Sequence, residues 1–252
     1  AEDRARGLLP LVVVANGGTT STGAIDPLPE LAEFCSENRI WLHIDAAYGG
    51  FAVLTERGKS WLKGLERADS ITLDPHKWLY QPFEVGCLLV RDGQRLERAF
   101  HAMPHYLQDT AVEGREVNFG DRGYQLTRSA RAVKVWLSIQ YFGLQAFRTA
   151  IDHTLDLTVY AEQQLRARPE FEILSPASLG IVCFRRIWPG LDEAGHDARN
   201  HELTRQLADS GTGMISSTRI DGRYSLRVCI LNHRTTAADI DEVVSFLSEK
   251  NS

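Results

Sequence analysis

Two charged side chains stand at the ends of apolar stretches, where a soluble protein rarely leaves a charge. Lys77 follows the stretch SITL within SITLDPHKW, and Asp45 follows the stretch IWLHI. A charge at the end of a buried strand is costly unless an opposite charge compensates it. The two residues could form a structural ion pair with each other, or Asp45 could pair with an arginine. Alternatively, both could face a bound molecule with a cationic ring nitrogen for Asp45 and an aldehyde for Lys77.

Pyridoxal phosphate carries both of those groups. Its enzymes use a lysine Schiff base together with a carboxylate at the pyridinium nitrogen. A lysine is a usable nucleophile when its surroundings destabilise the ammonium form, and the end of a buried strand favours this. The alternative for Lys77 is an ordinary surface lysine in a turn. The position of the lysine between two apolar stretches favours the cofactor.

The elements that must position these residues alternate between strands and helices. A helix is expected through LAEFCSEN, with Pro27 and Pro29 near its start. The stretches expected to form strands are 8–15, 40–44, 70–73 and 85–90. Such alternation predicts an α/β fold with a mostly parallel sheet, in which ligands bind at the carboxyl ends of the strands. Thr19, Thr20, Asp45 and the Lys77 segment are therefore expected at one rim.

The second half of the chain has a different pattern. A helical pattern runs from Ser129 to about Leu165, and Gly143 could break it in two. Hairpin-like strands and two helices follow Pro169, which is typical of a small α+β domain. Between the halves, residues 100–126 are polar, rich in glycine and without a sustained period, as in a functional loop.

Composition excludes several classes of protein. Lys and Arg number 28 against 33 Asp and Glu, so the net charge is −5, which argues against nucleic acid or an anionic membrane as a partner. The four cysteines are scattered, without a C-x-x-C pair, so neither a disulfide scaffold nor a metal site is expected, and a cytoplasmic location fits. His101 and His105 have a metal-like spacing, but Pro104 lies between them, and we interpret them as loop histidines.

Several motifs together make the sequence recognisable. HIDAAYGG and ADSITLDPHKW, with GGTTSTGAIDPL before them, resemble the pyridoxal-phosphate-dependent amino acid decarboxylases related to aromatic-L-amino-acid decarboxylase. MPHYLQD, QLTRSARAVKVW and YSLRVCILNHRTT extend the resemblance over nearly the whole chain. It implies the fold-type-I fold of these enzymes, with a partial cofactor domain at 1–142, a mobile catalytic loop at about 100–116, and a small α+β domain at 143–252.

The resemblance also implies the cofactor-binding residues. Lys77 would form the Schiff base, Asp45 would hold the ring nitrogen protonated, and Ala47 would pack against the ring. The remaining assignments are Thr20 beside the ring hydroxyl and the substrate carboxylate, and His76 and Ser70 on the phosphate side. Thr20 could instead be merely a turn residue.

Catalysis is assigned by the same resemblance to Lys77, His76 and Tyr106. Tyr106 matches the loop tyrosine that protonates the substrate carbon after carbon dioxide leaves, although it could be an ordinary loop aromatic. A phenylalanine at this position is associated in relatives with oxidative deamination, so the tyrosine favours simple decarboxylation. Arg128 and Arg131 match basic positions that we expect to anchor the loop.

Two features depart from the family pattern. Asp74 stands where several aromatic decarboxylases have asparagine, and a carboxylate aimed at a phosphate would repel it, so its side chain is expected to turn away or its backbone to do the work. Family members are also considerably longer. The chain is expected to be the carboxyl-terminal half, with a four-stranded sheet that leaves an apolar edge open.

The expected function is decarboxylation of an L-amino acid, with aromatic substrates such as tyrosine, tryptophan or DOPA favoured. The resemblance implies a homodimer with a small-molecule substrate and no nucleic-acid or membrane partner. Glutamate or 2,4-diaminobutyrate is the alternative substrate. From a different class, the chain could be a truncated, non-catalytic module that dimerises or binds a partner.

Overall fold

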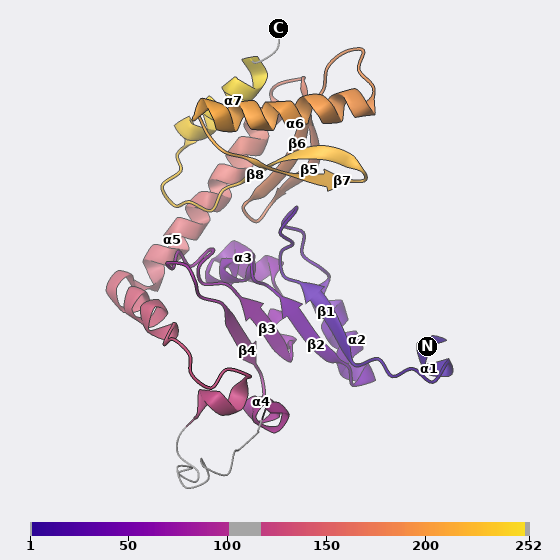
Figure 1. Ribbon diagram of the computed structural model, residues 1–252, viewed down its shortest axis with the longest axis vertical. Helices are drawn as coiled ribbons and strands as arrows, with labels where there is room; N and C mark the ends of the chain where they lie inside the picture. The colour runs from indigo at the N-terminus through magenta and orange to yellow at the C-terminus, as the bar shows by residue number, and fades with distance from the viewer. Residues whose placement is uncertain (1, 101–116, 250–252) are drawn as a thin grey trace.

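The computed structural model describes residues 2–100 and 117–249 and contains two β-sheets connected by a long helix (Figure 1). The strands are β1 (Val12–Asn16), β2 (Trp41–Asp45), β3 (Ser70–Leu73), β4 (Cys87–Val90), β5 (Phe171–Ser178), β6 (Ile181–Arg186), β7 (Ser216–Ile220) and β8 (Arg223–Cys229). The α-helices are α1 (Glu2–Ala5), α2 (Leu28–Asn38), α3 (Glu56–Trp61), α4 (Gly93–Phe100), α5 (Ala132–Arg166), α6 (Glu193–Ser210) and α7 (Ala237–Glu249). Short 3₁₀ turns are η1 (Gly50–Leu54), η2 (Leu65–Arg67) and η4 (Phe119–Arg122).

The first sheet has the strand order β1-β2-β3-β4. Strands β1, β2 and β3 are parallel, and β4 returns antiparallel to β3. Asn16 lies opposite Asp45, and Asp45 lies opposite Thr72, so the carboxyl ends of the three parallel strands meet at one rim. The predicted α/β class with a mostly parallel sheet is confirmed.

One face of this sheet is covered and the other is open. Helix α2 packs its small side chains Ala32 and Cys35 into the core formed with Leu42 and Ile44 of β2. Alternation along a strand sends every second side chain to the opposite face. On that face Val14 of β1 remains 60% exposed. Among the described residues, β1 and β4 each pair with a single strand, so both edges are open, as the sequence predicts for one of them.

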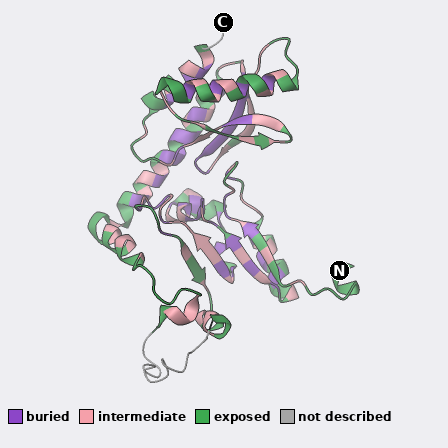
Figure 2. Cartoon of the chain, in the orientation of Figure 1, coloured by how far each residue is buried: buried purple, intermediate pink, exposed green. Residues whose placement is uncertain are grey.

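The second sheet is antiparallel, with the order β5-β6-β8-β7, and is covered more completely. Every residue of β6 is buried. Helices α5, α6 and α7 share one core with the strands, and Figure 2 shows the resulting concentration of buried residues. The opposite face of β6 contributes Ile181 and Cys183 to the core of the first sheet. The predicted small α+β unit is therefore present, and its central strand lies between two cores.

Helix α5 bends at Gly143, as the sequence predicts. The backbone there has φ 73° and ψ 153°, which a side chain would strain and glycine tolerates. Before the bend the helix is exposed at Trp136 and Tyr141, and after it Ile151 and Leu155 are buried. The predicted boundary between residues 142 and 143 falls at this bend, and the division into two domains there stays a prediction.

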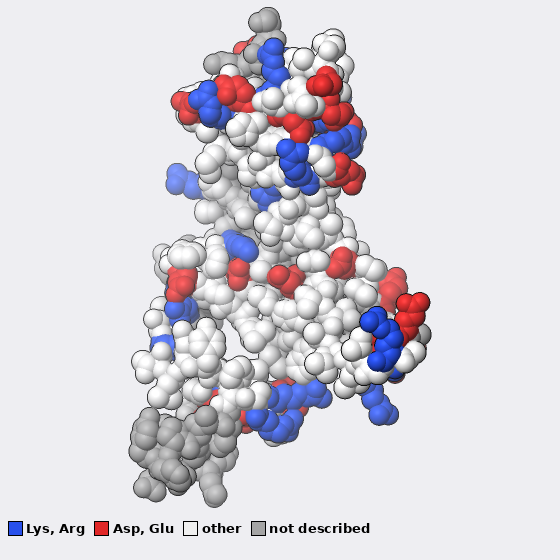
Figure 3. Space-filling view, turned by 45° about the vertical axis from the view of Figure 1, so that its right-hand side comes forward, with Lys and Arg blue, Asp and Glu red and all other residues white. Residues whose placement is uncertain are grey.

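Of the helices described, none is both long and apolar enough to cross a membrane. On the face shown in Figure 3, Lys and Arg side chains are interspersed with Asp and Glu.

Candidate active site

Lys77 lies in a tight turn directly after β3. The turn is closed by the Lys77 amide, which donates to the Asp74 carbonyl at 2.9 Å. Pro75 and Trp78 are buried beneath it, whereas the Lys77 side chain is 31% exposed. Buried Pro75 and Trp78 fix the backbone of the turn on either side of Lys77. The turn therefore sets where the Lys77 side chain begins, beyond the carboxyl end of β3.

The carboxylate that pairs with Lys77 is that of Asp74. The Asp74 Oδ2 atom lies 2.9 Å from Lys77 Nζ and 3.8 Å from His76 Nε2. The structural ion pair between Asp45 and Lys77 that the sequence allowed is not found among the described residues. Asp74, the departure from the family pattern, turns its side chain toward the lysine.

Asp45 ends β2 at the same rim, one strand away from the Lys77 turn. Its side chain is exposed, and its Oδ1 atom accepts the Ala47 backbone N–H at 3.1 Å. No arginine or lysine forms an ion pair with it within residues 2–100 and 117–249. Ala47 follows two residues later and is half-buried. A carboxylate that is exposed at a strand end has the free lone pairs that a ligand could use.

His76 is held by the segment that leads to β4. Its Nδ1 donates to the Val85 carbonyl at 2.7 Å, and its ring meets Phe83 edge-on with centroids 5.2 Å apart. This hydrogen bond leaves Nε2 facing the Asp74 carboxylate, beside the Lys77 amine. The structure thus gathers His76, Lys77 and Asp74 in one turn.

The other predicted residues lie apart from this turn. Ser70 is at the opposite end of β3, about 10 Å of extended strand from Leu73, and its buried hydroxyl is bound by Trp41 Nε1 and His43 Nδ1, each at 2.8 Å. Thr20 is exposed in the turn after β1. Tyr106 and the loop at 101–116 lie outside the described residues, as do His101 and His105.

Sequence reasoning missed a polar cluster on the open face of the first sheet. His43 lies between two hydroxyl groups, with Nδ1 at 2.8 Å from Ser70 and Nε2 at 3.1 Å from Thr72. His43 is two residues before Asp45, so strand alternation already puts both side chains on one face. That alternation was the signal that could have found it.

Of the two basic residues expected to anchor the loop, Arg128 contacts a segment that flanks it, and Arg131 contacts the segment that follows Lys77. Arg128 donates to the Phe119 carbonyl, just after the undescribed residues, and Arg131 forms an ion pair with Glu84. Neither contacts the Lys77 turn directly in the described residues. Their part in holding the catalytic loop stays a prediction.

Tyrosines near the turn are held neutral by their surroundings. Burial raises the pKa of Tyr80 to about 12, and burial also raises the pKa of Tyr48 well above its ordinary value. A phenol with so high a pKa is a poor proton donor near neutral pH. These two residues are therefore poor candidates for the proton donor, and the predicted proton donor remains Tyr106.

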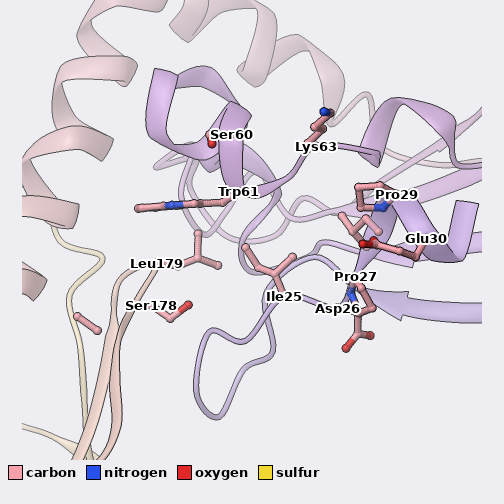
Figure 4. A pocket seen from close by; sticks show the side chains of 12 residues that line it. Ile25, Asp26, Pro27, Pro29, Glu30, Ser60, Trp61, Lys63, Ser178 and Leu179 are labelled. Atoms are coloured by element: carbon pink, nitrogen blue, oxygen red, sulfur yellow. The ribbon is translucent and has the colours of Figure 1, made fainter.

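A cavity of about 500 Å³ lies elsewhere, between the start of α2, the end of α3 and the tip of the β5–β6 hairpin. Figure 4 shows the Trp61 ring above Leu179 and Ile25 in this cavity. None of the predicted site residues lines it. The chemistry at the strand ends and this hollow are therefore separate.

Comparison with known proteins agrees with the fold. Residues 1–187 match the model of the pyridoxal-dependent decarboxylase conserved domain. The chain is 45% identical over 246 residues to an aromatic-L-amino-acid decarboxylase of Bacillus atrophaeus, covering 96% of this chain and 51% of that protein. It is 34% identical over 243 residues to an L-2,4-diaminobutyrate decarboxylase of Rhizobium meliloti, covering 96% and 49%. A solved structure of Oryza sativa TDC with PLP and tryptamine superposes with a TM-score of 0.91 at 29% identity, covering 98% of this chain and 52% of that one.

The chain belongs to the pyridoxal-dependent decarboxylase family. Membership confirms the predicted family, the fold-type-I architecture and, at the level of the family, the pyridoxal phosphate cofactor. The chain spans about half the length of the curated relatives it matches.

Proposed function

We propose that the protein to which these residues belong decarboxylates L-amino acids with pyridoxal phosphate, releasing the amine and carbon dioxide. The observation that carries the proposal is the rim of the first sheet. Asp45 and Lys77 lie at the carboxyl ends of adjacent parallel strands, both accessible and not paired with each other. In parallel sheets this rim is where ligands bind.

The residues at the rim fit the cofactor chemically. Lys77 offers an accessible amine for the aldehyde, and Asp45 offers a carboxylate with open lone pairs for the ring nitrogen. Ala47 is small enough to let a ring approach the backbone, and Thr20 is exposed in the neighbouring turn. Of the two residues assigned to the phosphate side, His76 is in the Lys77 turn.

The chain's own residues would act around the cofactor as follows. When bound, the cofactor supplies an electron-accepting ring that stabilises the negative charge left as carbon dioxide departs. Asp45 would keep a proton on the ring nitrogen, so that the ring stays electron-accepting. Lys77 would hold the cofactor covalently, and Asp74 and His76 would orient its amine. Tyr106 would return a proton to the substrate carbon.

Aromatic L-amino acids are the proposed substrates. The bacterial relative at 45% identity is named as an aromatic-L-amino-acid decarboxylase, and a rice relative at 31% identity is named as a tryptophan decarboxylase. The diaminobutyrate relative at 34% identity supports the second candidate, a decarboxylase of 2,4-diaminobutyrate or glutamate. A homodimer in the cytoplasm is part of the proposal.

The first experiment asks whether the site is assembled. Pyridoxal phosphate is added to the purified chain, the visible absorbance is recorded, the mixture is reduced with borohydride, and the modified lysine is located by mass spectrometry. We expect a visible band and the label on Lys77. Label spread over surface lysines such as Lys59 and Lys63 would contradict activity of this chain alone and favour the non-catalytic module.

The second experiment identifies the substrate. Carbon dioxide release is compared for tyrosine, tryptophan, DOPA, glutamate and 2,4-diaminobutyrate with the cofactor-loaded protein. Release from the aromatic amino acids supports the proposal, and release from glutamate or diaminobutyrate alone overturns the aromatic assignment. When the products of the same reactions are identified under air, Tyr106→Phe is expected to divert product from the amine to the aldehyde and ammonia, with dissolved dioxygen as the two-electron oxidant and hydrogen peroxide as its product.

A further inference from the structure

Helix α5 contacts the chain segment that follows Lys77 at several points along its length. Lys134 Nζ donates to the carbonyls of Pro82 at 2.8 Å and Glu84 at 2.9 Å. Farther along the helix, Ser138 Oγ accepts from Gln81 Nε2 at 2.8 Å. The turn that carries Lys77 is therefore connected to a helix that also builds the second core.

The deepest of these contacts is made by Thr154. Its hydroxyl accepts a hydrogen bond from the Trp78 indole N–H at 3.2 Å, and both side chains are fully buried. The same hydroxyl donates to the Ile151 carbonyl at 2.8 Å, so its proton is committed to the helix and a lone pair is free for the indole. Trp78 directly follows Lys77 in the sequence. Of the hydrogen bonds from α5 to this segment, the bond to Trp78 is therefore the one closest in sequence to the lysine.

Trp78 also connects the Lys77 turn to the strand that carries Asp45. Its ring stacks on Tyr48 with centroids 5.5 Å apart and an interplanar angle of 23°. Tyr48 is three residues after Asp45 and is buried. The space behind this pair is closed by Gly180, where an added Cβ would lie 3.0 Å from the Tyr48 hydroxyl and 3.2 Å from the Trp78 ring.

We propose that Thr154 is a positioning residue for Lys77. It fixes the indole of Trp78, and thereby the place of the Lys77 amine relative to Asp45, from a helix outside the first sheet. The expected effect of Thr154 on cofactor binding rests on the proposed function, whereas the hydrogen bond between Trp78 and Thr154 does not. Removing the acceptor leaves a buried indole N–H without a partner, and the turn must shift to satisfy it.

The chain offers a matched control at Thr158. This residue is one helical turn farther on, is also fully buried, and donates to the Thr154 carbonyl at 2.7 Å. In the described residues its hydroxyl has no bond to the Lys77 turn. Thr154→Val and Thr158→Val therefore each remove one buried hydroxyl from α5, but only the first removes the acceptor of Trp78, and Thr154→Ser restores it.

The test has one readout without cofactor and one with it. Without cofactor, the acetylation rate of Lys77 by acetic anhydride is compared with that of exposed Lys63 across pH, using peptide mass spectrometry. We expect Thr154→Val to change the ratio about two- to tenfold, the range that one net hydrogen bond allows. Thr158→Val and Thr154→Ser should stay near the unsubstituted protein.

With pyridoxal phosphate, the borohydride-fixed label on Lys77 and the pH midpoint of the visible band are measured for the same variants. Thr154→Val should lower the label about two- to tenfold and shift the midpoint, with Thr158→Val unchanged. Equal effects of the two valine variants, or none in either, would overturn the inference. If the unsubstituted protein gives no label on Lys77, the proposed function fails for this chain, and the acetylation ratio still decides the role of Thr154.

Discussion

The two sheets of this molecule differ in how completely their strands are covered. Central strand β6 of the second sheet is buried at every position, because α5, α6 and α7 cover one face and the first core covers the other. The first sheet has α2 on one face only, and on the other Val12, Val14 and Leu88 are 52%, 60% and 55% exposed. Yet the residues that we propose to bind the cofactor lie at the rim of the first sheet.

This difference separates the sheet that stabilises the fold from the sheet that carries the proposed active site. Burial of apolar area contributes roughly 25 cal/mol per Å², so the side chains around β6 carry much of the folding free energy. The open face of the first sheet contributes little in the described structure and displays the polar cluster of His43, Ser70 and Thr72. Substitutions in the two sheets should therefore have opposite signatures, in activity for one and in stability for the other.

The largest expected effect is on activity, at Lys77. Lys77→Arg retains a cation beside Asp74 but removes the amine that can bond to an aldehyde. Loss of a catalytic side chain of this kind lowers kcat/KM by at least about 10²–10⁴-fold. Steady-state carbon dioxide release by the cofactor-loaded protein checks this.

The same variant should scarcely affect folding, since the Lys77 side chain is partly exposed. We expect its free energy of unfolding in urea to stay within about 0.5 kcal/mol of the unsubstituted value. If Lys77→Arg remains active, Lys77 does not bind the cofactor covalently, and the active site proposed at the rim of the first sheet is wrong.

The next effect is on stability, and a pair of leucines isolates it. Leu226 of β8 is fully buried, whereas Leu88 of β4 is 55% exposed. Leu226→Ala should lower the free energy of unfolding by about 2–5 kcal/mol, and Leu88→Ala by no more than about 0.5 kcal/mol. Urea unfolding followed by far-UV circular dichroism measures both. Comparable losses of unfolding free energy in the two variants would mean that the open face of the first sheet is covered in solution. The two sheets would then not differ in how completely they are buried.

Much of this contrast was predictable from the sequence. The apolar stretches predicted the four strands of the first sheet, and the charged residues that follow two of them predicted the rim. The limits of the strands were predicted less accurately. The first strand, expected at 8–15, spans Val12–Asn16 in the structure. Residues 8–11 are apolar enough for a strand, but of these only Leu11 bonds to β2 in the described structure, through its carbonyl, which accepts the Trp41 N–H at 3.0 Å. Leu9 and Leu11 are 74% and 72% exposed. Apolar character alone therefore overestimates the length of an edge strand.

Contacts between distant residues were not predictable. Trp78 and Thr154 are 76 residues apart, and no local pattern connects an indole in a turn with a hydroxyl in a helix. The resemblance assigned Ser70 to the phosphate side of the cofactor, and that assignment stays a prediction. In the extended strand its side chain binds Trp41 and His43 at the far end. Motifs identify which residues matter, and only the fold says which of them meet.

A smaller effect is expected at the bend that lets α5 serve both sheets. Gly143→Ala puts a Cβ on a residue with φ 73°, which costs of the order of 1–3 kcal/mol if the bend is kept. The added atom meets no other part of the protein within 4 Å, so the cost is one of backbone strain alone. Urea unfolding should show this loss, and Gly143→Asn should show a similar one, because asparagine tolerates positive φ mainly where ψ is about +30 to +60°, whereas ψ here is 153°. No loss in Gly143→Ala would mean that α5 is straight in solution and that its contacts with the Lys77 turn differ from those described.

The smallest effect is on pH dependence, and it is confined to the second sheet. Arg185, buried in β6, donates hydrogen bonds to Glu193 at 2.6 Å and to Glu172 at 2.7 Å. The hydrogen bond from Arg185 lowers the pKa of Glu193 below its ordinary value. Because the folded pKa lies below the unfolded one, the stabilisation is present above the ordinary glutamate pKa of about 4.3 and is lost as the pH falls through the lower folded value.

Glu193→Gln should therefore lower the urea midpoint at pH 7, and the difference from the unsubstituted protein should shrink toward zero as the pH falls below about 4. Glu37→Gln on α2 is the control, because Glu37 is exposed and has no ion pair in the part of the chain that the structure describes. Its midpoint should follow the unsubstituted protein at every pH. If both variants behaved alike, acid would be acting on the whole surface charge and not on the buried arginine of β6. The second sheet would then owe its greater stability to apolar burial alone.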